Sequence, residues 1–294
     1  NACPGKMGNK AIKMISPTDN DKIQKDFDWL VDNNVNSQYK FKVMNVRNEG
    51  FVRPKFEFNG SCAGCGEAPY LKNLTQVFND NLYIANATGC SSIFGGSAPS
   101  TPYSVAWASS LFEDNAEYGL GILKGIEAKR EKISKYMKNN LNSDRELFEK
   151  WISNKDNYDI CVDVYKELDF GKHKYLNSLK GYIIPQSMWI IGGDGFAYDI
   201  GYGGLDHVLS RDDNILVLDT EVYSNTGGQA SKASQMGSIS SFATSGKRGY
   251  KKDLARMAMC YPHVYVACCN IGYNKEQYLK AIREASLHDG PSII

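Results

Sequence analysis

The sequence is first informative in what it lacks. No run of about 18 apolar residues occurs among its 294 residues, so we expect no segment that crosses a membrane. Its first residues, Asn1 to Gly5, do not resemble a secretory signal peptide. The formal net charge is +1, and no long block carries a single sign. We therefore expect neither a nucleic-acid-binding surface nor a charged disordered tail.

Cysteine is too scarce for a scaffold of disulfides, with eight in 294 residues. Their uneven spacing includes one C-x-x-C pair, which fits a reduced compartment and a metal or redox site. The eight are Cys3, Cys62, Cys65, Cys90, Cys161, Cys260, Cys268 and Cys269. We expect Cys260, Cys268 and Cys269 to pack in the core, because buried free cysteines are common.

Both ends of the sequence suggest a piece of a longer chain. An initiator methionine is missing, and the last residues, 290–294, read as the beginning of a strand. With 42% hydrophobic and 23% charged residues, the composition is that of a globular domain with a normal core. The length suits one large α/β domain or two small ones.

Two apolar runs end in oxygen-bearing residues, and they carry the strongest signal. Met188–Ile191 runs into Gly192-Gly193-Asp194-Gly195, and Ile215–Leu218 runs into Asp219-Thr220-Glu221 and then Asn225-Thr226-Gly227-Gly228. Glycine lets a backbone approach phosphate closely, and a carboxylate can hold a hard cation. Because parallel strands end at one edge of a sheet, the pair predicts a metal–diphosphate site there.

A second group of polar residues carries thiols. Cys62 and Cys65 stand among small residues, whose backbone N–H groups can turn toward sulfur. A short predicted strand, 82–85, leads into a segment of small polar residues that contains Cys90. Taken alone, C-x-x-C is compatible with zinc, an iron–sulfur cluster or a redox disulfide.

Helical and strand patterns alternate through the rest of the sequence, which predicts an α/β fold with a mainly parallel sheet. Helices are expected over 70–78, within 115–180, and over 201–209, 250–259 and 275–288, with strands over 263–269 and 292–294. The glycines of 201–204 do not have the spacing of a dinucleotide-binding loop. The long loop over 225–249 is expected to be functional, and His173 to lie on the surface.

Residues 1–50 are polar, and we expect an extended or partly helical arm, with one short amphipathic helix over 26–31, that wraps a neighbour. Within it, Cys3-Pro4 has two interpretations. It could be an ordinary cysteine, or the last cysteine of a bacterial ferredoxin pattern that begins before residue 1.

The motifs of residues 50–294 together resemble the C-terminal thiamine-diphosphate-binding domain of the pyruvate:ferredoxin (flavodoxin) oxidoreductases and the closely similar pyruvate:NADP⁺ oxidoreductases. They are Phe56–Glu67, Ile84–Gly96, Ser110–Gly119, Gly193-Asp194-Gly195 and Asp219–Gln229. The resemblance implies a thiamine-diphosphate-binding fold over 51–294, truncated at its C-terminus, and an arm over 1–50 that follows a missing ferredoxin-like domain.

The same resemblance implies a role for each matching residue. Asp194, the Thr220 hydroxyl and the Val222 carbonyl would bind Mg²⁺, with Thr220 in place of the amide that many thiamine enzymes use. Asn225 would reach the diphosphate and the bound 2-oxoacid and act in catalysis. Cys62, Cys65 and Cys90 would hold a [4Fe–4S] cluster. Thiamine diphosphate would be lined by Glu67, Cys90, Gly193, Gly195, Phe196, Glu221, Tyr223 and Ser224.

The implied activity is the oxidative decarboxylation of pyruvate to acetyl-CoA and CO₂, with electrons leaving singly through iron–sulfur clusters. Pyruvate and coenzyme A would be the small-molecule partners. Ferredoxin, flavodoxin or a fused flavoprotein domain would take the electrons from a homodimer in the cytoplasm, or in a reduced organelle of an anaerobic eukaryote. Two alternatives are a non-redox thiamine-dependent decarboxylase and a zinc-stapled module without enzymatic activity.

The sequence departs from the family in three places. The fourth cluster cysteine lies beyond Ile294 in that family, and the glutamate that protonates the aminopyrimidine lies in an N-terminal domain. We therefore expect residues 1–294 alone to bind the cofactor weakly, to hold no complete cluster and to be inactive. Between Tyr103 and Trp107 the family has a longer, glycine-containing connector, so either the connector is shorter in this protein or residues are missing from the sequence at this point.

Overall fold

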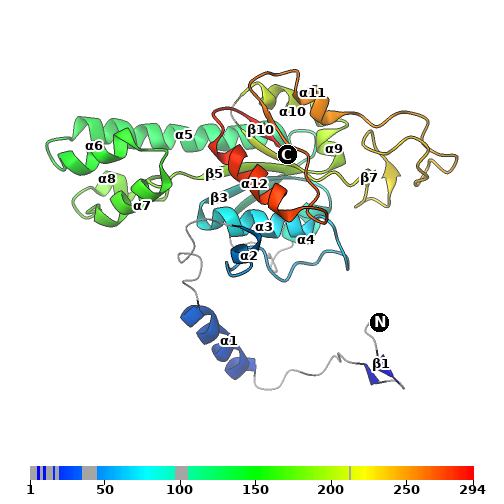
Figure 1. Ribbon diagram of the computed structural model, residues 1–294. Helices are drawn as coiled ribbons and strands as arrows, with labels where there is room; N and C mark the ends of the chain where they lie inside the picture. Colours follow the sequence, from blue (N-terminus) through cyan, green and yellow to red (C-terminus); the bar gives the residue numbers. More distant parts are fainter. Residues whose placement is uncertain are drawn as a thin grey trace.

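A mainly parallel sheet with helices on both faces forms the centre of the molecule (Figure 1). The computed structural model describes residues 5–6, 9–10, 16, 20–34, 45–96, 105–211 and 213–294. The six-stranded sheet has the order β4-β3-β5-β6-β10-β9, and every neighbouring pair is parallel. Its strands are β3 (Leu82–Ala87), β4 (Ala106–Ser110), β5 (Ser187–Gly192), β6 (Asn214–Val217), β9 (Tyr265–Val266) and β10 (Ser292–Ile293). The α/β class expected from the sequence is confirmed.

Helices make up most of the remaining regular structure. They are α1 (Asn20–Asn34), α2 (Val46–Glu49), α3 (Ala68–Phe78), α4 (Cys90–Gly96), α5 (Asn115–Asn139), α6 (Arg145–Ser153), α7 (Tyr158–Glu167), α8 (Lys174–Asn177), α9 (Asp194–Ala197), α10 (Tyr202–Leu209), α11 (Leu254–Ala258) and α12 (Lys275–Leu287), with the 3₁₀ turns η2 (Asn79–Asn81) and η3 (Lys180–Tyr182). Two small antiparallel pairs, β1 (Gly5–Lys6) with β2 (Asn9–Lys10) and β7 (Val222–Tyr223) with β8 (Gln229–Ala230), complete the fold. Among the described residues, no helix is both long and apolar enough to cross a bilayer.

The alternation of side chains along β5 divides the core into two layers. Met188 and Ile190 face one layer, which α5 and α10 cover. Trp189 and Ile191 face the other, which α3 and α12 cover. The backbone of α5 lies very close to the sheet, because a Cβ on Gly119 would lie 2.4 Å from Ile190 Cγ1. The sheet is thus buried on both faces, as its continuous apolar strands require.

A helical extension lies between β4 and β5 in the sequence and reaches out to one side of the sheet (Figure 1). The second half of α5 packs with α6, α7 and α8 around a separate apolar core that includes Phe148 and Trp151. The indole Nε1 of Trp151 donates to the Ile183 carbonyl at 2.9 Å, which ties the extension to the segment that enters β5. Helices were expected over 115–180, but the sequence did not show that they form a core of their own.

His173 was expected on the surface, and that prediction is wrong. Only 2% of His173 is exposed. Its Nε2 contacts the Asp144 carboxylate at the start of α6, and its Nδ1 lies 3.2 Å from the Tyr136 hydroxyl on α5. Lysines stand on both sides of His173, so in the sequence the segment looks like exposed surface. Lys172 Nζ lies 2.9 Å from the same Asp144 carboxylate. His173 therefore fastens α8 to the two helices around it.

Two expectations about the C-terminal cysteines are also wrong, because Cys260 and Cys268 are exposed. The strand predicted over 263–269 is only β9, Tyr265–Val266, at the edge of the sheet. The chain leaves the sheet before it reaches Cys268. Cys269, in contrast, is partly buried and packs against the core layer of α3 and α12.

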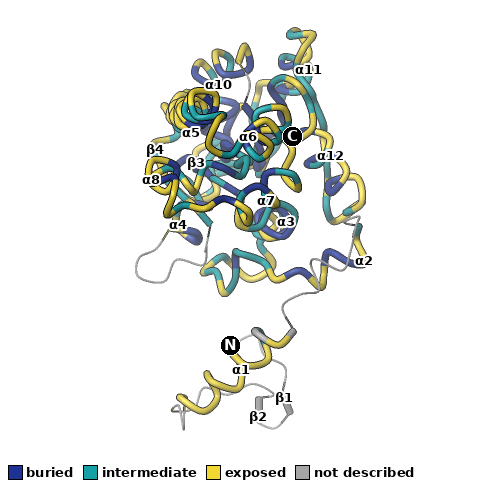
Figure 2. The backbone as a smooth tube through the Cα atoms, turned by 90° about the vertical axis from the view of Figure 1, so that its left-hand side faces the viewer, coloured by how far each residue is buried: buried dark blue, intermediate teal, exposed yellow. Residues whose placement is uncertain are grey.

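The N-terminal part of the chain is only partly described. The short helix expected over 26–31 is confirmed within the longer α1, whose apolar side chains are exposed (Figure 2). Cys3-Pro4 and residues 97–104, which include Tyr103, lie outside the described residues. Helix α2 already belongs to the folded domain, because buried Glu49 pairs with Lys275 of α12.

The order of the strands places a crevice between the carboxyl ends of β3 and β5. After β3 the chain continues to β4 on one side, and after β5 it continues to β6 on the other. Connections that leave neighbouring strands in opposite directions open a gap at the carboxyl edge, where α/β proteins bind ligands.

The role of His173 can be tested with His173→Ala. We expect the free energy of unfolding to fall by about 2 kcal/mol, because the buried ring loses its hydrogen bonds and its packing. Urea denaturation followed by circular dichroism measures the change. The matched variant Lys172→Met removes an exposed contact to the same carboxylate and should cost less than about 1 kcal/mol. Equal effects of the two variants would contradict the assignment.

Candidate active site

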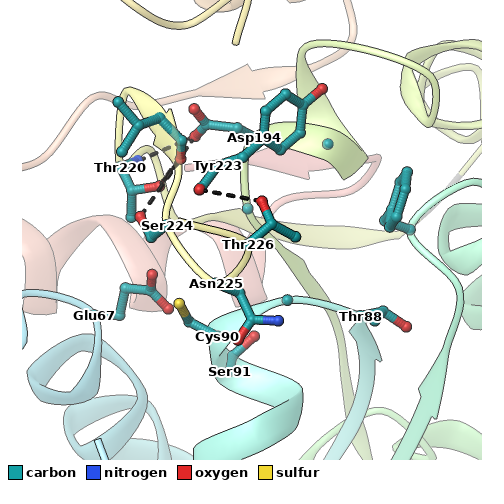
Figure 3. A pocket seen from close by; sticks show the side chains of 15 residues that line it. Glu67, Thr88, Cys90, Ser91, Asp194, Thr220, Tyr223, Ser224, Asn225 and Thr226 are labelled. Carbon is teal, nitrogen blue, oxygen red and sulfur yellow. Dashed lines mark hydrogen bonds between the residues drawn. The ribbon is translucent and has the colours of Figure 1, made fainter. Parts of the chain in front are cut away.

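A pocket opens at this crevice and is lined by the residues that follow β3, β5 and β6 (Figure 3). Its empty space is about 590 Å³, the open mouth included. Asp194, Thr220 and Tyr223 lie together in the close-up, while Glu67, Cys90 and Ser91 lie opposite them. The full lining is Glu67, Thr88, Gly89, Cys90, Ser91, Phe112, Gly193, Asp194, Gly195, Thr220, Val222, Tyr223, Ser224, Asn225 and Thr226.

Asp194 is the buried carboxylate of the pocket, with 3% of the residue exposed. It is the first residue of α9, directly after the glycines that end β5. Its Oδ1 accepts the backbone N–H of Thr220 at 3.1 Å, and its Oδ2 accepts the hydroxyl of Ser231. The side chain is thus fixed from the end of β6 and from the loop that follows β8.

The other two expected metal ligands are the Thr220 hydroxyl and the Val222 carbonyl, and the Thr220 hydroxyl lies between that carbonyl and the Asp194 carboxylate. Thr220 Oγ1 lies 3.4 Å from Asp194 Oδ1 and 2.9 Å from the Val222 carbonyl oxygen. Between them, Glu221 has a φ of +61°, in the left-handed region that costs a non-glycine residue about 1 kcal/mol or more. The strained turn folds the chain so that the Thr220 hydroxyl and the Val222 carbonyl meet.

Burial changes the acidity of two carboxyl groups in the pocket. Desolvation raises the pKa of Asp194 to about 6, and the charge of Asp219 adds to this, although the bonds from Ser231 and Thr220 oppose it. Desolvation and the charge of Asp194 raise the pKa of Glu67 to about 7. Without a cation, the pocket therefore disfavours the charged forms of both acids.

The oxygens of Asp194, Thr220 and Val222 suit a hard divalent cation. One carboxylate, one hydroxyl and one carbonyl leave room for diphosphate oxygens and water, as Mg²⁺ requires. The charge of a cation would also offset the cost of burying the ionised Asp194 carboxylate, which is the cost that raises its pKa. These three residues therefore fit Mg²⁺ on chemical grounds.

Of the three candidate cluster cysteines, Cys90 lines the opposite side of the pocket, and Cys62 and Cys65 lie near enough to influence its charge. Cys62 and Cys65 are joined by a turn, in which the Cys65 N–H donates to the Cys62 carbonyl at 3.0 Å. Burial, followed by the charges of Glu67, Cys65 and Cys62, raises the pKa of Cys90 to about 11. In the described ranges, however, no group of three or more His, Cys, Asp or Glu side chains has the geometry to hold a metal ion. The cluster assignment stays a prediction.

The other expected site residues separate into two groups. Gly193, Gly195, Tyr223, Ser224 and Asn225 line the pocket. Gly195 is closely surrounded, because a Cβ there would lie 3.2 Å from the rings of both Phe112 and Tyr223, which would have to shift slightly to accept it. The catalytic role of Asn225 stays a prediction.

Phe196 and Glu221 do not line the pocket. Phe196 is 1% exposed, and its ring lies over Gly192, where an added Cβ would come within 2.5 Å of it. Glu221 lies in the turn between two lining residues and bonds away from the pocket, to Lys251 and Gln235. Their contact with the cofactor also stays a prediction.

Several residues of the site were not singled out in the sequence. Thr88 joins the ends of β3 and β4 through a hydroxyl that donates to the Ser110 carbonyl at 2.8 Å. Phe112 forms an aromatic wall, and Ser231 holds Asp194. Thr88 and Phe112 lie within motifs that matched the family, which is the signal that could have found them. Ser231 lies in a long polar loop and has no such signal.

Comparisons with known proteins agree with this geometry. Residues 182–294 match the family model described as thiamine pyrophosphate enzyme, C-terminal TPP binding domain. A chain of the 2-oxoglutarate:ferredoxin oxidoreductase from Magnetococcus marinus, solved with 2-oxoglutarate, coenzyme A and succinyl-CoA bound, has a TM-score of 0.51 at 15% identity. The match covers 88% of this chain and 69% of that one. The thiamine-diphosphate-binding α/β fold is confirmed.

Relatives with more similar sequences are named as pyruvate oxidoreductases. The pyruvate:ferredoxin oxidoreductase of Moorella thermoacetica is 43% identical over 99% of this chain and 27% of its own length. The pyruvate-flavodoxin oxidoreductase of Trichormus variabilis is 46% identical over 87% of this chain and 24% of its own. The resemblance drawn from the motifs is confirmed. The chain spans about a quarter of the length of these relatives.

The raised pKa of Glu67 predicts a pH dependence of stability. An unfolded glutamate ionises near pH 4.5, whereas Glu67 in the fold keeps its proton to about pH 7. The folded state binds more protons between these values, so stability without cofactor should fall as pH rises through that window, by roughly 2 kcal/mol.

Glu67→Gln should remove the part of this fall that Glu67 causes, since glutamine does not titrate, and should leave the smaller part that the raised pKa of Asp194 causes at lower pH. Urea unfolding of both proteins at pH 5 and pH 8 measures the effect. Parallel losses of stability in the two proteins would show that Glu67 is not responsible.

Proposed function

We propose that this chain supplies the Mg²⁺–diphosphate side of the thiamine diphosphate site in an oxidoreductase that converts pyruvate and coenzyme A into acetyl-CoA and CO₂. The observation that carries the proposal is the convergence of Asp194, Thr220 Oγ1 and the Val222 carbonyl at the ends of β5 and β6. They stand at one side of a pocket whose other side carries Glu67 and Cys90. The names of relatives that align with nearly all of the chain support the substrate.

When bound, thiamine diphosphate supplies a carbanion equivalent that permits decarboxylation of a 2-oxoacid. The chain's own part is to bind and orient that cofactor. Asp194, Thr220 and Val222 hold the cation, and Gly193 and Gly195 let the backbone approach the diphosphate. Phe112 and Tyr223 form walls beside Gly195. Asn225 reaches from the β7 turn toward the diphosphate and the 2-oxoacid.

The thiols and the electron acceptor belong to the same proposal. Cys62, Cys65 and Cys90 supply three ligands of a [4Fe–4S] cluster, and a further cysteine of the full-length protein supplies the fourth. The remaining domains provide the rest of the active site, as the greater length of the relatives suggests. A one-electron carrier accepts the electrons, in keeping with the ferredoxin and flavodoxin in those names.

The pocket and the relatives weigh against the two alternatives. A zinc-stapled module would leave the convergent oxygens of Asp194 and Thr220 without a purpose. A non-redox decarboxylase would not need Cys62, Cys65 and Cys90 as cluster ligands, and relatives named as oxidoreductases align with nearly the whole chain.

The metal assignment is tested with Asp194→Ala and with two variants of Thr220 in the full-length protein. Asp194→Ala should abolish Mg²⁺-dependent binding of thiamine diphosphate, because the only carboxylate among the three proposed metal ligands is lost while the neutral alanine is tolerated. Thr220→Val should weaken binding by about tenfold or more, whereas Thr220→Ser keeps the hydroxyl and should bind nearly normally. Isothermal titration calorimetry measures the affinities, and unchanged affinity in Asp194→Ala would refute the assignment.

The cluster assignment is tested by Cys90→Ser in the anaerobically purified full-length protein. We expect lower iron content and lower absorbance near 400 nm, since serine does not replace a thiolate ligand well. Cys260→Ser, at an exposed cysteine far along the chain, serves as the control and should keep both. Full iron content in Cys90→Ser, or bound zinc in the unaltered protein, would count against the cluster.

A further inference from the structure

We propose that Lys251 is a positioning residue that fixes the metal-binding turn of residues 219–222 from behind. This inference rests on the proposed function, because it assigns how the Mg²⁺–diphosphate site keeps its geometry. It concerns a residue that neither lines the pocket nor is expected to touch the cofactor.

Alternate residues of the turn of residues 219–222 face opposite sides of it. Thr220 and Val222 line the pocket and offer the oxygens for the cation. Asp219 and Glu221 direct their carboxylates to the other side of the turn, where both meet Lys251. The turn therefore has a ligand side and an anchored side, and residues on the anchored side set the orientation of those on the ligand side.

Lys251 joins both carboxylates at short range. Its Nζ lies 2.6 Å from Asp219 Oδ2 and 2.9 Å from Glu221 Oε1. The Tyr198 hydroxyl also donates to Asp219 Oδ2, at 2.7 Å. The side chains of Lys251 and Asp219 are 25% and 31% exposed, so their bond is partly shielded from water, whereas the Glu221 side chain is 46% exposed and its bond is closer to that of a surface ion pair.

The loop that carries Lys251 contacts the site at both of its ends. At its start, Ser231 donates to Asp194, and Ser234 and Gln235 bond to Glu221. At its end, Lys251 closes over the same turn. Within the loop, Lys247 Nζ donates to the Ser234 carbonyl at 2.6 Å, which draws the two ends together. The loop thus surrounds the anchored side of the turn.

The conformation of Glu221 explains why the turn needs such an anchor. A glutamate at φ +61° is strained, and a free turn would relax toward a negative φ. Relaxation would move the Val222 carbonyl away from the Thr220 hydroxyl and disperse the ligands. Bonds to the Glu221 side chain from Lys251 and Gln235 oppose that movement.

The experiment compares three variants of the full-length protein. Lys251→Met keeps the length of the side chain and removes both bonds, whereas Lys251→Arg keeps the charge and the donors. Arg248→Met removes one positive charge from the same loop at an exposed residue, and so controls for the loss of charge alone. Calorimetric titration of thiamine diphosphate at increasing Mg²⁺ gives the half-saturating Mg²⁺ concentration, and thermal unfolding without cofactor reports on the fold.

We expect Lys251→Met to raise the half-saturating Mg²⁺ concentration by about tenfold, the usual size of effect for a residue that orients a metal ligand. Lys251→Arg and Arg248→Met should stay within about twofold of the unaltered protein. Loss of a nearby positive charge would by itself favour cation binding, so a weaker Mg²⁺ response cannot arise from simple repulsion.

An unchanged Mg²⁺ response in Lys251→Met would overturn the inference, as would an equal rise in Arg248→Met. A lower unfolding temperature of Lys251→Met without any change in the Mg²⁺ response would also overturn it, because that result would show that Lys251 only stabilises the fold. If Lys251→Met does not fold, Lys251→Gln takes its place with the same criteria. Absence of Mg²⁺-dependent binding in the unaltered protein would instead refute the proposed function, and the inference with it.

Discussion

The link between Asp194 and Thr220 is the constraint on which the site depends. It joins the ends of two neighbouring strands, because Asp194 follows β5 and Thr220 follows β6. The register of the sheet sets it, with Gly192 opposite Val217 and the Leu218 N–H donating to the Gly192 carbonyl at 2.9 Å. A shift of one residue would turn every side chain of β6 to the other face. The packing of the two core layers therefore also determines where the proposed metal ligands meet.

That link holds a carboxylate in a place that is unfavourable for it without a cation. Burial raises the pKa of Asp194 to about 6, and the bonds from Ser231 and Thr220 offset only part of the desolvation. The site is thus arranged for a ligand at some expense to the stability of the free protein. In the proposed function, a cation and diphosphate would bind the folded state alone, and their binding would return stability to the same region. Folding and cofactor binding would then be coupled through this one side chain.

The sequence predicted the parts of the site that lie next to each other in the chain. Apolar runs that end in Gly-Asp-Gly and Asp-Thr-Glu identify strand ends without knowledge of the fold, and the parallel sheet follows from the alternation of elements. Lys251, Ser231 and His173 could not be found in this way. Each acts on a residue 29 to 37 positions away, and each lies in a polar segment that looks like ordinary surface. Cys268 shows the reverse error, since an apolar run ended earlier than its composition suggested.

The choice of threonine at position 220 accounts for the compactness of the proposed metal site. Its hydroxyl already contacts the Val222 carbonyl at 2.9 Å within the same turn, so two of the three ligands form one local unit. A β-branched side chain has few rotamers and keeps that orientation without further support. Only Asp194 comes from another strand. The site therefore has two requirements, which are the register between β5 and β6 and the strained backbone at Glu221. Packing of the core fixes the register between β5 and β6, and the loop that surrounds the turn holds the strained backbone at Glu221.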